Sequence, residues 1–247
     1  MVKARGLVVV ALLAGVVALP VAAQTPAAAP EPVAQGVNPA DPWESFNRSV
    51  FRFNEGVDQA VLKPVAKAYQ SAAPEVVKTG VSNVFGNLRD IWSTVNLFLQ
   101  FKPKAGLQMG TRVLINSTLG LYGLLDIATP AGLDRQSEDF GQTLGHWGVG
   151  SGPYVMLPLL GPSTLRDATA LVVVDRNGDP LGELTPVADR NVAVAVRVVD
   201  QRSKLLPMEK TMDAIALDRY SFIRDAYLQR RRYDIFDGNP PDEGQQD

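Results

Sequence analysis

Hydrophobic residues recur along much of the chain at helical spacing. From residue 43 to residue 61, large apolar side chains stand three or four positions apart, which puts them on one face of a helix. Glu44 and Arg48 lie off that face, and Asp41 followed by Pro42 is typical of an N-cap and first turn. The predicted face consists of Trp43, Phe46, Val50, Phe53, Val57 and Val61.

A second stripe predicts a longer amphipathic helix over residues 81–99, ending before Lys102-Pro103. Its apolar members are Val81, Val84, Phe85, Leu88, Ile91, Trp92, Val95, Phe98 and Leu99. By pattern alone, both stripes fit packing in an ordinary core as well as they fit contact with lipid.

Residues 105–128 are apolar nearly all round, and Gly120 and Gly123 interrupt the run. Such segments are buried either in a large core or in hydrocarbon. Beyond them, glycine and proline punctuate the chain from Gly141 to Gly161, where regular structure is predicted to stop. Thr164 and Asp167 then have the spacing of a capping box, which predicts a new helix.

Two further segments complete the predicted elements. Between Val192 and Val198, valines alternate with other residues as in a strand, but no hairpin partner is visible, so a helix is favoured. A final helix is indicated around Ile215 to Leu228, where apolar and charged residues mix at helical spacing. The predicted fold class is therefore mainly α.

The two ends of the chain differ in composition from its centre. Lys3 and Arg5, an apolar run and small residues near Ala23 have the layout of a secretory signal peptide, with a retained anchor as the alternative. Cleavage after Ala23 would lower the formal net charge from -2 to -4. Residues 24–40 predict a disordered Ala/Pro-rich tether, 41–237 one domain, and 238–247 a disordered tail.

Composition excludes several kinds of chemistry. The sequence contains no cysteine, so it has no thiolate metal site, no thiol nucleophile and no lipobox. With one histidine and no basic stripe beyond Arg230-Arg231-Arg232, neither a histidine metal site nor nucleic-acid binding is expected. No cofactor and no catalytic residue is predicted.

The remaining candidates for chemistry are weak. Ser151 and His146 would suggest a lipid hydrolase, but the Gly-x-Ser-x-Gly elbow is absent, and the nearby glycine run has no strand before it as a nucleotide loop requires. Arg112 and Arg166 lie in or beside apolar stretches, where a cation needs a partner. A structural ion pair, with Asp126 or Asp167, is favoured over a lipid headgroup contact.

Several motifs in order along residues 41–237 resemble the VacJ/MlaA family, the outer-membrane component of a phospholipid-trafficking system that is usually a lipoprotein. The opening motif is DPWESFNR at 41–48, followed by VNLFLQ at 95–100 and RVLINSTLG at 112–120. The most distinctive block is FGQTLGHWGVG at 140–150 with GPY at 152–154, and TLRD at 164–167 and DRY at 218–220 follow.

The resemblance implies a ring of amphipathic helices around a channel, with a glycine-rich loop, seated in the inner leaflet of the outer membrane. It implies removal of mislocalised phospholipid from the outer leaflet, with a trimeric porin and a soluble periplasmic lipid carrier as partners. A porin-associated scaffold without transport remains an alternative. Because the lipobox cysteine is missing, the mature protein is expected to carry no acyl chain and to stay on the periplasmic side of the outer membrane by apolar contact.

The resemblance also implies roles for particular residues. Gly148 and Gly150 match the family's hinge. The expected lipid-channel or headgroup contacts are Arg112, Asn116, Asp126 and Arg166. The expected membrane-facing residues are Trp43, Phe46, Phe53, Leu121 and Leu124.

Overall fold

The structure is a computed structural model that describes residues 38–241. The predicted signal peptide and most of the predicted tether lie outside the described residues, as do residues 242–247. The first residues of the predicted tail hydrogen-bond to the last helix, with the Gly238 amide donating to the Tyr233 carbonyl at 2.9 Å. The predicted domain boundaries stay predictions.

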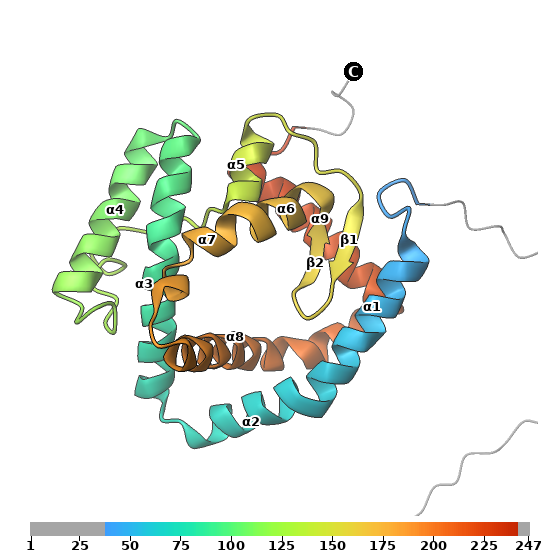
Figure 1. The fold of residues 1–247 in the computed structure, drawn as a ribbon, viewed down its shortest axis with the longest axis horizontal. Helices are drawn as coiled ribbons and strands as arrows, with labels where there is room; N and C mark the ends of the chain where they lie inside the picture. Colours follow the sequence, from blue (N-terminus) through green and yellow to red (C-terminus); the bar gives the residue numbers. More distant parts are fainter. Residues whose placement is uncertain (1–37, 242–247) are drawn as a thin grey trace, which may run out of the picture. The chain divides into compact units, whose positions relative to one another are not determined.

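The described chain is mainly helical, which confirms the predicted fold class. The longer helices are α1 (Glu44–Val57), α2 (Lys63–Ala72), α3 (Glu75–Leu99), α4 (Pro103–Thr118), α8 (Val187–Ile215) and α9 (Arg219–Ile235), and a π-helical turn, η1 (Asp58–Leu62), joins α1 to α2. Within residues 38–241, α1, α2 and α3 follow one another around the edge of the domain, α4 lies against α3, and α8 lies beside α2 (Figure 1). A channel through the domain stays a prediction.

Short elements connect α4 to α8. They are α5 (Phe140–His146), β1 (Tyr154–Leu157), β2 (Gly161–Thr164), α6 (Leu165–Ala170), η2 (Leu171–Asp175), α7 (Arg176–Gly178) and η3 (Pro180–Glu183). The prediction that regular structure stops from Gly141 to Gly161 was wrong. Asp139 caps α5 by accepting the Gln142 amide at 2.8 Å, and β1 pairs antiparallel with β2 from Tyr154↔Thr164 to Leu157↔Gly161. The glycines and prolines from Gly148 to Pro158 lie between these short elements, whereas Gly141, Gly145, Gly161 and Pro162 lie inside α5 and β2.

Helices α3 and α4 form a hairpin. Helix α3 ends at Leu99, which confirms the predicted end of this helix before Lys102-Pro103. Its burial is inverted relative to an ordinary core helix. Polar Asn87, Asp90 and Asn96 of α3 are buried, while apolar side chains of the predicted stripe, among them Val95 and Phe98, are exposed. The stripe therefore marks a helix that is not packed in a core, because four of its nine members are exposed and the other five are only partly buried.

The apolar segment 105–128 is likewise not a core helix. Helix α4 ends at Thr118, and most of the apolar side chains of the segment are exposed, including Leu114 at 66% and Leu121 at 60%. Among residues 38–241, no helix is long and apolar enough to span a membrane.

The other predicted helices are present. The valine-alternating segment 192–198 lies inside α8, so the helical interpretation is confirmed over the strand. Thr164 caps α6 by accepting the Asp167 amide at 3.2 Å, as the capping-box spacing predicted. Asp218 caps α9 by accepting the Tyr220 amide at 3.2 Å.

A small conventional core lies between α1, the β-hairpin and α9. Tyr154, Met156 and Tyr220 are almost fully buried there, with Phe51 and other partly buried residues packed against them. Asp41 was predicted to cap α1, but α1 begins at Glu44 and Asp41 makes no such cap. Its carboxylate is buried and accepts hydrogen bonds from Asn47 at 2.8 Å and from the Tyr220 hydroxyl. A buried carboxylate needs such partners, and these come from two different helices.

Candidate functional site

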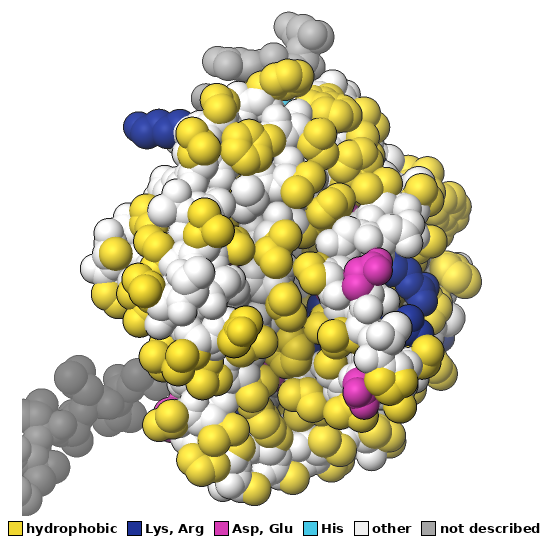
Figure 2. All heavy atoms as spheres, turned by 60° about the vertical axis from the view of Figure 1, so that its left-hand side comes forward, with side chains coloured by type: hydrophobic (Ala, Val, Ile, Leu, Met, Phe, Trp, Pro, Cys, Tyr) yellow, Lys and Arg dark blue, Asp and Glu magenta, His cyan; other side chains and the backbone are white. Residues whose placement is uncertain are grey.

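The outer surface carries many exposed apolar side chains. Figure 2 shows the face of the domain that contains α3 and α4. Hydrophobic groups are spread over this face, with few charged groups among them. All five predicted membrane-facing residues are exposed, namely Trp43, Phe46, Phe53, Leu121 and Leu124. An apolar surface of this extent on a folded domain marks a contact with a membrane or a partner.

Beneath this surface, Arg112 of α4 is almost fully buried, with 1% of its side chain exposed. Its guanidinium donates to Asp90 of α3 at 3.1 Å, to Asp126 at 2.6 Å and to the Leu133 carbonyl at 2.7 Å. The predicted ion pair with Asp126 is therefore present, and Asp90 is a second partner that the sequence did not reveal. Arg112 joins both helices of the hairpin to the loop that follows them.

Asn116 lies one helical turn after Arg112 and fastens the same loop. Its amide nitrogen donates to Asp126 at 3.1 Å, and its carbonyl oxygen accepts the Ile127 and Ala128 amides. Burial alone would raise the pKa of Asp126, but hydrogen bonds from Thr129 and Arg112 outweigh it and hold the pKa below its usual range. Arg112, Asn116 and Asp126 hydrogen-bond within one network, which supports a structural role for them. Their contact with lipid stays a prediction.

Arg166, the fourth predicted contact, pairs with Asp167 as the sequence favoured, at 2.9 Å. It also donates to the Val149 carbonyl at 3.0 Å, while its own amide donates to Ser151. The glycine-rich loop is thus fastened to the start of α6. The Trp147 indole fastens the other side of the loop by donating to the Leu99 carbonyl at the end of α3, at 3.2 Å.

The two predicted hinge glycines differ in conformation. Gly148 has a φ of +86°, a region that favours glycine, whereas Gly150 does not lie in that region. Neither has a heavy atom near the position that a Cβ would take. Only Gly148 is therefore required by the local backbone.

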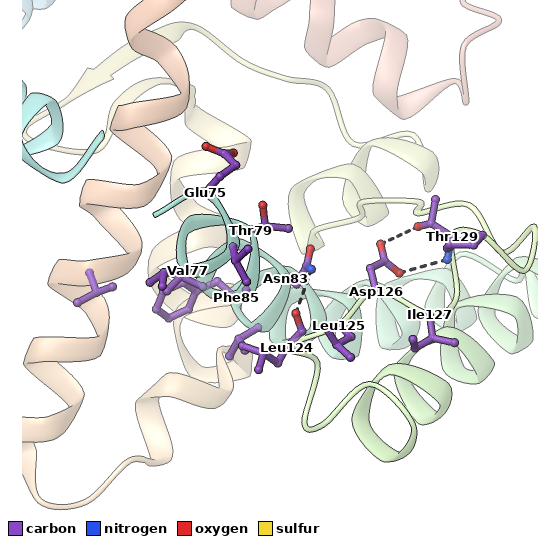
Figure 3. Close-up of a pocket in the computed structure, with 16 residues that line it drawn as sticks. Glu75, Val77, Thr79, Asn83, Phe85, Leu124, Leu125, Asp126, Ile127 and Thr129 are labelled. Carbon is purple, nitrogen blue, oxygen red and sulfur yellow. Dashed lines mark hydrogen bonds between the residues drawn. The ribbon is translucent and has the colours of Figure 1, made fainter. Parts of the chain in front are cut away.

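A groove of about 1000 Å³ opens between the first half of α3 and the loop after α4. Figure 3 shows Val77 and Phe85 on α3 and Leu124, Leu125 and Ile127 on the loop. Asn83 donates to the Leu124 carbonyl at 3.1 Å and holds the loop against the helix. The groove lies within the exposed apolar surface, and its shape and lining suit a hydrocarbon chain.

On the inner side of α3 lies a cavity of a different kind, of about 410 Å³, with many charged groups in its lining. Arg231 of α9 donates two hydrogen bonds to Asp139, each at 2.6 Å, and one to Asp167 at 2.9 Å. Burial raises the pKa of Asp175, which accepts the Trp92 indole and the Phe140 amide. The surface around α3 and α4 is therefore largely apolar, whereas this inner cavity has charged side chains in its lining.

The sequence analysis did not identify the buried polar residues of α3 or the charged residues of the inner cavity. A signal was available, because short polar residues recur at helical spacing opposite the apolar stripe of α3, at Asn87, Asp90, Ser93 and Asn96. Two members of the basic run Arg230-Arg231-Arg232 have carboxylate partners. Arg231 points inward and pairs with Asp139, and Arg230 pairs with Asp234.

The structure gives no support to the hydrolase alternative. No group of three or more His, Cys, Asp or Glu residues within 38–241 is arranged to hold a metal ion. His146 lies exposed at the end of α5, and across the described residues its side chain makes no hydrogen bond, to Ser151 or to any other group.

Comparison with known proteins gives consistent matches. The profile of the family described as MlaA lipoprotein matches residues 39–234. The "Intermembrane phospholipid transport system lipoprotein MlaA" of Escherichia coli K12 is 36% identical over 204 residues, which cover 78% of each chain. A protein of Rickettsia bellii is 34% identical over 195 residues, covering 79% of this chain and 76% of its own.

A solved structure supports the same relationship. It is described as "Structural basis for maintenance of bacterial outer membrane lipid asymmetry" and is 37% identical, with a TM-score of 0.65. The match covers 81% of this chain and 99% of the solved chain. The similarity therefore extends over nearly all of the described domain.

Proposed function

This chain belongs to the MlaA lipoprotein family, and from that premise we propose that it transports phospholipid between the membranes of a bacterial envelope. It removes mislocalised phospholipid from the outer leaflet of the outer membrane through an amphipathic channel and so maintains lipid asymmetry. It then passes the lipid to a soluble periplasmic carrier.

The observation that carries this proposal is the burial pattern of the α3–α4 hairpin, in which apolar side chains are exposed and charged side chains are buried. Leu114 and Leu121 are exposed on the outside, while Arg112 and Asp90 are buried beneath them. Exposed leucines and valines in such number are unfavourable in water, but they suit a domain surrounded by hydrocarbon. A polar interior, in turn, suits the passage of a charged headgroup.

The location and partners follow from the same reasoning. The domain sits in the inner leaflet of the outer membrane, on the periplasmic side, with Trp43, Phe46 and Phe53 of α1 turned toward acyl chains. A trimeric porin lies against its apolar rim, and the carrier meets its periplasmic side. Because the sequence has no cysteine for an acyl anchor, apolar burial and porin contact hold the mature protein at the membrane after signal-peptide cleavage.

The domain works without catalysing a reaction. Relatives are named for phospholipid transport, and the loop that contains Ser151 acts by movement about Gly148 and Gly150 rather than by chemistry. Arg166 links that loop to α6 through the Val149 carbonyl, so movement of the loop is coupled to the short elements that line the inner cavity.

Transport in cells tests the proposal. In a strain that lacks the gene, outer-leaflet phospholipid should rise, and expression of the chain should restore the normal amount. Release of free fatty acid that depends on Ser151 would support a hydrolase instead. Porin binding without any change in outer-leaflet phospholipid would support a scaffold.

A further inference from the structure

One cation on the inner side of α3 has no counter-ion. Arg89 makes no hydrogen bond and no ion pair with any other described residue, and its side chain is exposed. Two guanidinium groups near it are paired, since Arg135 bonds Asp90 at 2.9 Å and Arg197 bonds Asp179 at 2.6 Å. Of these three cations, only Arg89 is therefore available to a ligand.

Arg89 is placed where its guanidinium can bind a phosphate group. It lines the inner cavity of about 410 Å³ together with Arg197. Its pKa is lowered from the usual value by burial first and then by the neighbouring Arg135 and Arg197. A group that is both accessible to water and surrounded by protein lies inside a hydrated cavity. There, a phosphate can form two charge-assisted hydrogen bonds with the planar guanidinium.

The apolar groove begins one helical turn away. Phe85 lines both the groove and the inner cavity, and it precedes Arg89 by four residues on α3. The same change occurs on α8, where Val196 lines the groove and Arg197 lines the cavity. An apolar site for a chain and a cationic site for a phosphate thus meet where α3 and α8 approach each other.

We propose that the groove and Arg89 together bind one phospholipid molecule, with an acyl chain along Val77 and Leu124 and the phosphate at Arg89. The inference rests on the proposed function and specifies its lipid site.

Three of the five carboxylates in the cavity lining are paired with Arg231 or Arg197, which leaves Glu138 and Asp175 without a paired cation among the described residues. These two carboxylates disfavour a headgroup with a net negative charge. A zwitterionic headgroup places its phosphate at Arg89 and its ammonium toward the carboxylates. The preferred class is therefore a zwitterionic phospholipid.

Binding by the purified full chain in detergent micelles tests the inference. The probes are dihexanoyl phosphatidylethanolamine, dihexanoyl phosphatidylglycerol, dihexanoylglycerol and inorganic phosphate. Arg89→Gln should weaken phosphatidylethanolamine binding about tenfold, the range of one charged hydrogen bond, and leave dihexanoylglycerol binding unchanged. Arg89→Lys should weaken it less. Phosphatidylglycerol should bind more weakly than phosphatidylethanolamine, and inorganic phosphate more weakly than either.

Two substitutions on the apolar surface separate the groove from its surroundings. Val77→Asp should weaken both phosphatidylethanolamine and dihexanoylglycerol, whereas Leu114→Asp, on the same surface but outside the groove, should weaken neither. Both residues are substantially exposed, and circular dichroism should show that each variant is folded.

Three results would overturn the inference. Unchanged phosphatidylethanolamine binding by folded Arg89→Gln would remove the phosphate site. Inorganic phosphate bound as tightly as the lipid, with no effect of Val77→Asp, would make Arg89 a site for free phosphate. Tighter binding of phosphatidylglycerol would exclude the zwitterionic preference. Failure of the proposed function would appear separately, as lack of complementation by the unaltered chain.

Discussion

The α3–α4 hairpin and the small core around the β-hairpin are folded by opposite patterns of burial. In the core, Tyr154 and Met156 are buried, as in most soluble domains. In the hairpin, Arg112 and Asp90 are buried while Leu114 is exposed. Buried ion pairs need several hydrogen bonds to compensate for lost hydration, and Arg112 has them. The core is therefore stabilised by apolar burial, and the hairpin by a polar network.

This difference shows which part of the molecule depends on its environment. The core excludes its apolar groups from water by itself. The hairpin leaves its apolar groups at the surface, where lipid, detergent or a protein partner must cover them. The two regions should therefore respond differently to loss of a charge, loss of volume, loss of membrane contact and acid.

The largest expected effect is the loss of the buried charge in the hairpin. Arg112→Met leaves Asp126 without its cation, and removing one member of a buried pair typically costs about 3–5 kcal/mol. Denaturant unfolding in detergent micelles measures this loss. As a control, Arg230→Met removes an exposed pair with Asp234 and should cost at most about 1 kcal/mol. Equal stability of the two variants would show that the hairpin does not rely on its polar network.

Loss of volume should affect the core instead. Met156 is 2% exposed, so Met156→Ala leaves a cavity in the core. Such a cavity lowers the free energy of unfolding by about 2–5 kcal/mol. Leu114→Ala removes an exposed apolar side chain from α4 and should change the free energy of unfolding in micelles by about 0.5 kcal/mol or less. A similar cost at both sites would mean that the surface of α4 is packed against protein rather than detergent.

Loss of apolar contact should weaken membrane association without unfolding the domain. Phe53 is exposed on α1, and a charge at a lipid-facing position costs up to about 2–4 kcal/mol. Phe53→Asp should therefore float less with liposomes. Ser45→Asp adds the same charge off the apolar face of α1 and should float normally. If Phe53→Asp floats as the unaltered chain does, the lipid-facing assignment of α1 is wrong.

Acid should loosen the hairpin before the core. Hydrogen bonds from Thr129 and Arg112 hold the pKa of Asp126 below its usual range, so its stabilising contribution is fully present above about pH 4 and is lost as pH falls through the lower folded pKa. Hydrogen exchange should show reduced protection of residues 112–133 as the pH falls below about 4, while β1 stays protected. Asp126→Asn should abolish this dependence of the hairpin on pH. Loss of protection at pH 5 would contradict the assignment.

Much of the fold could be predicted from the sequence, because helical spacing and caps are local signals. Thr164 and the stripe of α3 are examples. The polar face of α3 was visible in the sequence, but that this face is the buried one could not be predicted, since spacing identifies a face and not its surroundings. Asp41 looked like a cap because its partners, Asn47 and Tyr220, are brought to it only by the tertiary fold. Arg89 was missed for the same reason, because an unpaired cation is recognised only when its neighbours are known.

The smallest expected effects concern the glycine-rich loop, which joins the two regions by running from α5 to β1. Gly148→Ala forces a φ of +86° on a residue with a Cβ and should cost about 1–2 kcal/mol. Gly150 lies outside that region with no atoms near the Cβ position, so Gly150→Ala should leave the fold intact and only reduce backbone freedom. Thermal unfolding in micelles measures both.

Gly150→Ala therefore tests movement of the loop without strain. If the loop is a hinge, stiffening it should slow transport although the protein accumulates normally and binds porin, because gating loops depend on such freedom. The double variant Gly148→Ala/Gly150→Ala should fail to clear outer-leaflet phospholipid from a strain that lacks the gene, and Gly150→Ala alone should clear it partly. Gly56→Ala, in α1 with open space around it, controls for the added methyl group. Full clearance by the double variant would make this loop a rigid connection, fastened by Arg166 and Trp147, between the polar hairpin and the apolar core.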